Sequence, residues 1–222
     1  MQWAFAPGGR VLELNCGTGE DAVALACRGV HVVATDASAA MVAATRAKAD
    51  AAGVGQFVAT RALTIEQAAS ADGPFDGVLS NFGGLNCVTD LGAAAHAIAS
   101  VVRPGGRAVL CIMGPVVPWE WAWFLGHGQP GKAVRRLRRS VEWRGLEVRY
   151  PSVGRAVRAF APDFTLHRRW GAGVALPPPY TEPWAARHTG LVGTLDRIDR
   201  RIEAWPGAAA LADHYVLELV RR

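Results

Sequence analysis

Residues 11–20, VLELNCGTGE, constrain the fold more than any other segment of the chain. A short apolar run is followed by a turn that contains Gly17 and Gly19, and a helical pattern begins at Glu20. A strand, a glycine turn and a helix in this order are typical of an α/β protein that brings its backbone close to a nucleotide. Glycine suits this turn because a side chain would keep a ligand away from the N–H groups at the start of the helix.

The charge of the turn indicates which kind of nucleotide it suits. A dinucleotide-binding turn has glycine at three positions, G-x-G-x-x-G, and here these positions hold Asn15, Gly17 and Glu20. Glu13, Glu20 and Asp21 also surround the turn with negative charge, which would repel a pyrophosphate and attract a cation. S-adenosylmethionine carries a sulfonium and an ammonium and has no phosphate, so it matches this charge.

Strand-like and helix-like segments alternate along the chain. We expect strands at 10–14, 31–35, 56–60, 75–80, 107–113, 164–172 and 214–222, and helices at 20–28, 39–52, 91–102 and 153–160. Such alternation predicts a parallel sheet with helices on both faces. At 222 residues the chain is long enough for one large α/β domain, so we expect a single domain over residues 1–222.

Four motifs in this order resemble those of the class I S-adenosylmethionine-dependent methyltransferases. They are the acidic glycine turn at 13–19, VVATDAS with Asp36, FDGVLSNFGG at 75–84 and RPGGRAVLCIMG at 103–114. Asp36 follows Gly19 by 17 residues, close to the ~20-residue spacing of a carboxylate that binds ribose hydroxyls. The resemblance covers residues 9–114 and, more weakly, the final strand. It implies a Rossmann-like, doubly wound, mostly parallel seven-stranded sheet with an antiparallel last strand.

The resemblance also assigns parts of the cofactor to residues. Gly17 and Gly19 would give its amino-acid end access to the backbone, Glu13 would act near its ammonium, and Asp36 would hold its ribose. Asn15 replaces a family glycine, and asparagine adopts left-handed conformations more readily than most residues. The predicted cofactor-binding residues are Glu13, Asn15, Gly17, Gly19, Asp36, Ala37, Met41, Ala62, Asn81 and Phe82. Met41 is equally well interpreted as helix core.

Two features depart from the family pattern. Arg61 stands about where the family has an adenine-contacting carboxylate, which leaves the backbone N–H of Ala62 for that contact. The segment before the first strand is also short, so we expect the family's N-terminal helix over the cofactor to be missing from this sequence.

Methyl transfer from a sulfonium needs no protein nucleophile, because the cofactor brings the electrophile and the protein aligns the acceptor. The predicted catalytic residues are Asn81, His127 and His188. Asn81 follows the fourth strand, whose end lies beside the methyl group in this family, although 80–87 is also a plausible turn without a ligand. The two histidines are candidate general bases. We expect no metal site, since the four cysteines lack metal-ligand spacing.

Two insertions, at about 115–150 and 176–212, leave the carboxyl ends of predicted strands. Ligands bind at that edge of an open α/β sheet, so we expect the insertions to form a helical cap over the substrate. Trp119 and Trp123 share a helix face and are expected to line an apolar roof with the PPPY segment at 177–180, although packing of the cap onto the sheet is the commoner role of such tryptophans.

Residues 132–149 hold seven basic side chains against two glutamates. We expect a solvated face in which Arg135, Arg136, Arg138 and Arg139 stay in water, with an acidic substrate, an anionic lipid surface or RNA as alternatives. Residues 108–125 are too interrupted by glycine, proline and glutamate for a transmembrane span, and no signal peptide is evident. A cytoplasmic location is therefore expected.

These patterns predict a methyltransferase that uses S-adenosylmethionine to methylate an oxygen, nitrogen or carbon atom of a small molecule. Two alternatives remain open. One is an RNA or protein methyltransferase that uses the basic segment, although Asn81 is not followed by the proline pair of the nucleic-acid adenine methylases. The other is a non-catalytic protein that binds S-adenosylmethionine. The sequence does not identify the substrate or the oligomeric state.

Overall fold

The computed structural model describes residues 4–81, 83–138, 140–143, 145–178 and 181–222. Its first half alternates strands with helices, as the sequence predicts. The elements are β1 (Arg10–Leu14), α1 (Glu20–Ala26), β2 (His31–Asp36), α2 (Ala39–Ala51), β3 (Val58–Ala62), β4 (Phe75–Ser80), α3 (Leu91–Val101) and β5 (Val102–Met113). Two 3₁₀ turns, η3 (Ile65–Ser70) and η4 (Gly84–Cys87), follow β3 and β4.

The second half adds short elements around the last strands of the sheet. The first insertion contains α4 (Pro118–Gly126), α5 (Pro130–Ala133), η5 (Arg135–Leu137) and the hairpin of β6 (Val141–Trp143) with β7 (Leu146–Val148). After α6 (Val153–Phe160) and β8 (Phe164–Ala172), the second insertion contains α7 (Glu182–Arg187), α8 (Thr189–Ile202) and α9 (Ala208–Leu211), and β9 (His214–Arg221) ends the fold.

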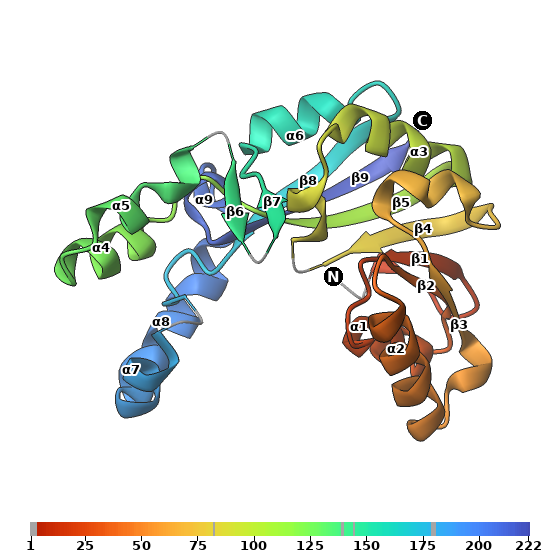
Figure 1. Cartoon of the computed structure of the whole chain (residues 1–222), viewed down its shortest axis with the longest axis horizontal. Helices are drawn as coiled ribbons and strands as arrows, with labels where there is room; N and C mark the ends of the chain where they lie inside the picture. The colour runs from red at the N-terminus through yellow and green to blue at the C-terminus, as the bar shows by residue number, and fades with distance from the viewer. Residues whose placement is uncertain (1–3, 82, 139, 144, 179–180) are drawn as a thin grey trace.

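Seven strands form the main sheet in the order β3-β2-β1-β4-β5-β9-β8. β9 runs antiparallel to both of its neighbours, and the other adjacent pairs are parallel. The predicted Rossmann-like sheet with an antiparallel last strand is confirmed. Figure 1 shows α3 and α6 on one face of this sheet and α1 and α2 on the other.

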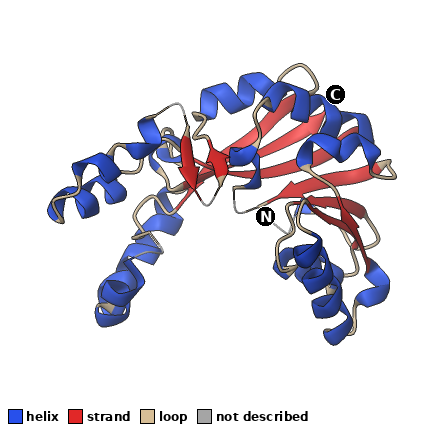
Figure 2. Ribbon diagram, viewed as in Figure 1, coloured by secondary structure: helices blue, strands red, loops and turns tan. Residues whose placement is uncertain are grey.

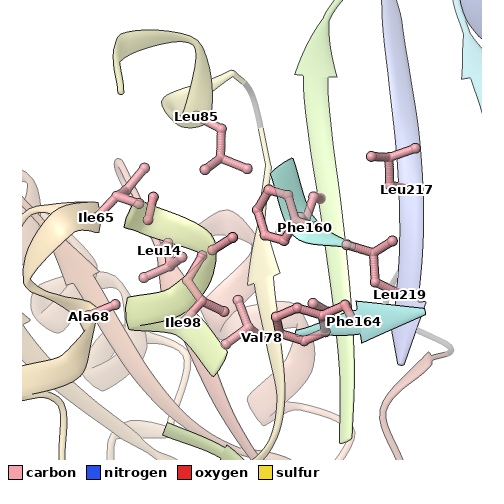
Figure 3. Close-up of a cluster of buried hydrophobic side chains, with 14 of the residues drawn as sticks. Leu14, Ile65, Ala68, Val78, Leu85, Ile98, Phe160, Phe164, Leu217 and Leu219 are labelled. Atoms are coloured by element: carbon pink, nitrogen blue, oxygen red, sulfur yellow. The ribbon is translucent and has the colours of Figure 1, made fainter. Parts of the chain in front are cut away.

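The core lies on both faces because successive strand residues point to opposite sides. Leu12 and Leu14 of β1 pack with Ile98 and Phe160 on the α3–α6 face, a cluster that Figure 3 shows in part. Val11 packs on the other face with the α1 helix. Both faces of the central strands are therefore buried, as is usual for a parallel sheet.

The helix boundaries follow local capping. The Ser38 side chain accepts a hydrogen bond from the Met41 N–H at the start of α2, and Asp90 caps α3 in the same way. β3 begins two residues later than predicted because residues 55–57 form a 3₁₀ turn. Among the described residues, no helix combines the length and the hydrophobicity needed to span a bilayer.

The two insertions form arms at one end of the sheet. In Figure 1, α4 with α5 and α7 with α8 project away from the strands on the side where the chain leaves β5, and Figure 2 shows that both arms are helical. The β6–β7 hairpin lies between the arms and the sheet. The expectation that the insertions leave the carboxyl ends of strands agrees with this placement.

Candidate active site

The strand order places a ligand site between β1 and β4. From β1 the chain moves outward through β2 to β3, then crosses back to β4 and continues in the other direction to β5. The loops after β1 and β4 therefore leave the sheet on opposite faces. A crevice opens between such loops at the carboxyl ends of the strands, which is where open α/β sheets bind ligands.

The turn after β1 depends on left-handed backbone at three residues. The φ angles are 50° at Asn15, 54° at Gly17 and 83° at Gly19. Asn15 thus takes the left-handed conformation that the sequence interpretation required of it. At Gly19 a Cβ atom would lie 2.8 Å from Cγ2 of Thr45, so a larger residue would also push α2 away from the turn.

Side-chain amides join this turn to the end of β4. The amide nitrogen of Asn15 donates to the carbonyl oxygen of Asn81, and Ser80 Oγ donates to Asn15 Oδ1 at 2.7 Å. Asn81 Nδ2 in turn donates to Asp21 Oδ2 at 2.7 Å. At Gly84 a Cβ atom would collide with the Asn15 side chain. The two loops that border the crevice are therefore fixed relative to each other.

Asp36, at the end of β2, is held beside the glycine turn. Its carboxylate accepts hydrogen bonds from the backbone N–H of Gly17 at 3.0 Å and of Ser38 at 2.9 Å. Thr45 Oγ1 donates to the Gly17 carbonyl at 2.9 Å and anchors the other side of the turn. Thr45 was missed in the sequence, because a threonine inside a helical pattern gives no signal of this contact.

Glu13 is the most unusual group in the crevice. Glu13 is only 2% exposed, and its Oε2 atom has no hydrogen-bond partner. Burial raises the pKa of Glu13 well above its usual range, and the nearby Asp21 and Asp36 carboxylates raise it further. A buried carboxylate without a partner is costly, and a cation placed beside it would remove that cost.

Two adjoining cavities occupy the crevice. The larger one, here the β1–β4 pocket, has a volume of about 500 Å³ and runs along the glycine turn to the β6–β7 hairpin. It is lined by Glu13, Asn15, Cys16, Gly17, Thr18, Glu20, Asp21, Met41, Asn81, Gly83, Gly84, Cys87, Met113, Trp143, Leu146 and Val148. This lining is acidic near the turn and apolar near the hairpin, and its described residues include no basic side chain.

The second cavity, here the β2–β3 pocket, has a volume of about 300 Å³ and extends past Asp36 toward the end of β3. It is lined by Asn15, Asp36, Ala37, Leu63, Thr64, Ile65, Glu66, Gly84, Cys87, Val88 and Leu146. Four of these residues, Asn15, Gly84, Cys87 and Leu146, also line the β1–β4 pocket, so the two cavities form one elongated crevice.

Comparison with known proteins identifies the domain that builds this crevice. Residues 11–106 match the family model described as a methyltransferase domain. The matched segment covers somewhat less than half of the chain, and its similarity to methyltransferase domains agrees with the family that the four sequence motifs predict.

Curated relatives of this methyltransferase domain include demethylmenaquinone methyltransferases. The protein of Mycobacterium marinum is 41% identical over 107 residues, which are 48% of this chain and 42% of that one. The protein of Beutenbergia cavernae is 41% identical over 117 residues, or 51% of this chain and 45% of that one. The match thus spans less than half the length of each of these relatives.

Solved structures share the fold over nearly the whole chain. A geranyl diphosphate C-methyltransferase from Streptomyces coelicolor A3(2) aligns with a TM-score of 0.64 and 15% identity, covering 98% of this chain and 74% of that one. A TehB-like methyltransferase from Corynebacterium glutamicum aligns with a TM-score of 0.60 and 11% identity, covering 98% and 83%. At these identities the similarity concerns the fold alone.

The methyltransferase domain brings most of the predicted cofactor residues into the crevice. Glu13, Asn15, Gly17 and Asn81 line the β1–β4 pocket, and Asp36 with Ala37 lines the β2–β3 pocket. Gly19 lies behind this lining as the N-cap of α1. Phe82 lies outside the described residues.

Two of the predicted cofactor-binding residues, Met41 and Ala62, lie in positions that the sequence did not indicate. Met41 is 37% exposed and lines the β1–β4 pocket, so it is not helix core. Ala62 ends β3 opposite Asp36, and the lining begins one residue later at Leu63. Arg61 is paired with Asp72 at 2.8 Å and lines neither pocket.

The two predicted histidines lie on the arms and outside both pockets. His127 and His188 are exposed, and their Nδ1 atoms contact the carbonyl oxygens of Trp123 and Trp184 four residues earlier. Neither lines either pocket. Asn81 is thus the one predicted catalytic residue that the described structure brings to the crevice.

The tryptophan roof is not where the sequence interpretation places it. Trp119 donates its indole N–H to the Ala175 carbonyl at 2.6 Å, and its ring lies 6.1 Å from that of Trp184. Trp123 lies against His127. The Trp119–Trp184 contact joins the two arms, and the tryptophan that lines the β1–β4 pocket is Trp143 on the hairpin. The described part of the PPPY segment, 177–178, lines neither pocket.

The expectation that the basic segment is solvated is wrong for Arg136. This side chain is 7% exposed and lies 2.6 Å from both Glu120 and Asp213. Glu120 is 1% exposed and also pairs with Arg135 at 2.8 Å. The sequence pattern counted charges along the segment and missed the buried carboxylate that neutralises two of them. Arg138 is exposed, as expected, and Arg139 lies outside the described residues.

Proposed function

We propose that the chain is an S-adenosylmethionine-dependent methyltransferase that acts on a small molecule. The observation that carries the proposal is Glu13, a buried carboxylate with an unpartnered oxygen at the floor of the β1–β4 pocket. A ligand with an ammonium group satisfies this oxygen, whereas the pyrophosphate of a dinucleotide would meet the carboxylates of Glu13, Glu20 and Asp21.

The residues of the crevice fit the cofactor in an orderly way. Glu13 and the backbone at Gly17 would hold its amino-acid end in the β1–β4 pocket. Asp36 would accept hydrogen bonds from the ribose, since each carboxylate oxygen has lone-pair capacity beyond its one backbone N–H contact. Ala37 and the 63–66 segment would enclose the base in the β2–β3 pocket.

The mechanism requires alignment and exclusion of water more than acid–base chemistry. When bound, S-adenosylmethionine supplies a methyl group on sulfur, with a neutral thioether as the leaving group. Asn81 holds the Asp21 carboxylate in place and so shapes the wall of the pocket. Met113, Trp143 and Leu146 form its apolar side and would position an acceptor for in-line attack by oxygen, nitrogen or carbon.

The apolar side of the pocket favours an acceptor that is largely apolar. The relatives are named as demethylmenaquinone methyltransferases, which is consistent with this class of acceptor. We propose that the hairpin part of the first insertion, residues 141–148, acts as the cap over the acceptor. The arms formed by α4 and by α7 with α8 contribute no lining residue to either pocket.

Calorimetric titration tests the cofactor assignment. We expect S-adenosylmethionine and S-adenosylhomocysteine to bind in the crevice and NAD not to bind. Release of S-adenosylhomocysteine against a panel of quinols, phenols and amines then tests catalysis. Binding of NAD in place of S-adenosylmethionine would refute the proposal, and tight binding without turnover on any acceptor would favour the non-catalytic alternative.

A further inference from the structure

Exposed apolar side chains are concentrated in the insertions. Of the ten large hydrophobic residues that the described chain exposes, nine lie between Leu125 and Leu211, and the other is Met41 in the crevice. Single exposed apolar residues are normal on any protein surface. A concentration of nearly all of them in the second half of the chain is unusual, and it indicates that this part of the surface takes part in an interaction.

Positive charge is concentrated in the same part of the chain. Residues 115–212 contain 15 Lys and Arg against 8 Asp and Glu, a net charge of +7. Residues 1–114 contain 7 Lys and Arg against 9 Asp and Glu, a net charge of −2. This excess comes from residues 115–150, with 7 Lys and Arg against 3 Asp and Glu, and from residues 151–175, with 4 against 1, whereas residues 176–212 hold 4 of each.

Helix α8 combines the two properties on adjoining faces. Leu191, Leu195, Ile198 and Ile202 recur at intervals of three and four residues, which places them on one side of the helix. Leu191 is 48% exposed and Ile198 is 41% exposed, so this side is not covered by the fold. The exposed Arg197 and Arg201 flank it on the same helix. Of the other charged residues of α8, Arg200 pairs with Asp196 and Asp199 is buried, so the exposed charge beside the apolar side is basic. An amphipathic helix with an uncovered apolar side and flanking arginines is typical of the membrane interface.

The other arm repeats the pattern. Leu125, at the end of α4, is exposed, and so are Leu137 and the basic Lys132 and Arg138 that follow it. Both arms lie at the end of the sheet where the chain leaves β5, as Figure 1 shows, and the residues that line the crevice follow β1 and β4 at their carboxyl ends. Trp143 and Leu146, which line the β1–β4 pocket, are exposed on the hairpin between the arms and the sheet. A flat surface that contacts the arms would lie at the crevice end of the molecule.

We propose that the two arms dock the protein on an anionic lipid surface. Apolar side chains such as Leu191 and Leu125 enter the boundary between headgroups and acyl chains, and the arginines of α8 contact the anionic headgroups. A nucleic acid would satisfy only the basic residues, and an uncharged protein surface would satisfy only the apolar ones. Anionic headgroups attract Lys and Arg side chains near the surface, and salt weakens this attraction.

Flotation with lipid vesicles tests the docking surface independently of methyl transfer. We expect the protein to float with vesicles of phosphatidylcholine and phosphatidylglycerol, to be released by high salt, and to float poorly with phosphatidylcholine alone. The double variants Leu191→Glu with Ile198→Glu, and Arg197→Glu with Arg201→Glu, are each expected to lower the bound fraction about tenfold. The variant Arg28→Glu with Arg222→Glu makes the same change of charge outside the arms and is expected to float like the wild type.

All of these substitutions are at exposed positions, and thermal unfolding followed by circular dichroism will verify that the variants are folded. Absence of flotation with anionic vesicles by the folded wild type would overturn the proposal. So would loss of binding in the Arg28 and Arg222 variant to the same extent as in the arm variants, because binding would then follow net charge. A wild-type dimer that Leu191→Glu with Ile198→Glu dissociates, without flotation, would assign the apolar side to a second copy. RNA binding that the apolar variant retains, again without flotation, would assign the arginines to nucleic acid.

Discussion

Replacement of Glu13 by glutamine tests the central electrostatic argument. The substitution keeps the size of the side chain and removes its charge. In the wild type the carboxylate is buried and its Oε2 has no partner, so it destabilises the protein without ligand and stabilises a bound cation. We therefore expect the two effects of Glu13→Gln to be opposite: a more stable free protein and weaker binding of S-adenosylmethionine.

The expected sizes of these two effects follow from the burial of the Glu13 carboxylate. A hydrogen bond to a charged group contributes about 1.5–3 kcal/mol, so loss of the carboxylate should weaken binding by roughly ten- to a hundredfold. Relief of an unsatisfied buried charge should stabilise the free protein by about 1–3 kcal/mol. Glu182→Gln, on the exposed first turn of α7, makes the same chemical change away from the crevice and is the matched control.

The pH dependence has a defined sign. The pKa of Glu13 is raised in the folded protein, so the folded state holds this proton more tightly than the unfolded chain does. The stability that the folded protein gains from holding this proton is therefore lost as the pH rises from ~4.3 through the raised pKa of Glu13. Free wild type and Glu13→Gln should have similar stability at low pH and diverge as the pH increases.

Binding of the cofactor should follow the opposite trend. An ammonium group binds the ionised carboxylate, so affinity should rise with pH, and binding below the raised pKa should release a proton. Titration calorimetry in two buffers with different ionisation enthalpies measures that proton. Unchanged affinity of Glu13→Gln, together with no proton release by the wild type, would refute the assignment of Glu13 to the ammonium.

Three further predictions concern separate parts of the molecule. Asp36→Ala should weaken binding of S-adenosylmethionine by about 1–3 kcal/mol in calorimetry, because it removes a charged acceptor at the ribose; an unchanged affinity would contradict the ribose assignment. Trp143→Ala should lower turnover of an acceptor found in the panel more than cofactor affinity, whereas Trp123→Ala, outside the pocket, should change neither; equal effects of the two would argue against the hairpin as cap. Arg136→Ala should lower the free energy of unfolding by about 3–5 kcal/mol because it leaves Glu120 buried without its nearest cation, and the exposed Arg138→Ala should change it by less than about 0.5 kcal/mol in the same denaturant titration.

The cofactor half of the fold could be predicted closely because its signals are local. β1 and β4 begin and end at the predicted residues, since each is a short apolar run bounded by turn residues. Asn15 could be assigned a left-handed conformation from its place in the glycine turn alone. The contact of Thr45 with the Gly17 carbonyl could not be predicted, because it joins residues 28 positions apart with no sequence pattern to pair them.

The acceptor half could not be predicted as well because its determinants are contacts between distant segments. Tryptophans such as those of α4 are common in the walls of apolar pockets, yet Trp119 packs against Trp184 from the other arm. The hairpin had a readable signal: VEW and LEV are separated by an Arg-Gly pair, the pattern of two strands with a two-residue turn. That signal predicts a hairpin and not its position at the pocket.

The difference between the two halves reflects how each recognises its ligand. In the proposed function, the cofactor is recognised by the backbone of a glycine turn and by single carboxylates at strand ends, and short stretches of sequence predict both. The proposed acceptor side is formed by Met113, Trp143 and Leu146. Apolar residues are common throughout the chain, so only the tertiary structure shows that these three line one pocket. The buried Arg136 joins the first insertion to the residue just before β9 through its ion pair with Asp213. The acceptor is therefore selected by tertiary packing, and its identity has to be found from the pocket and its variants.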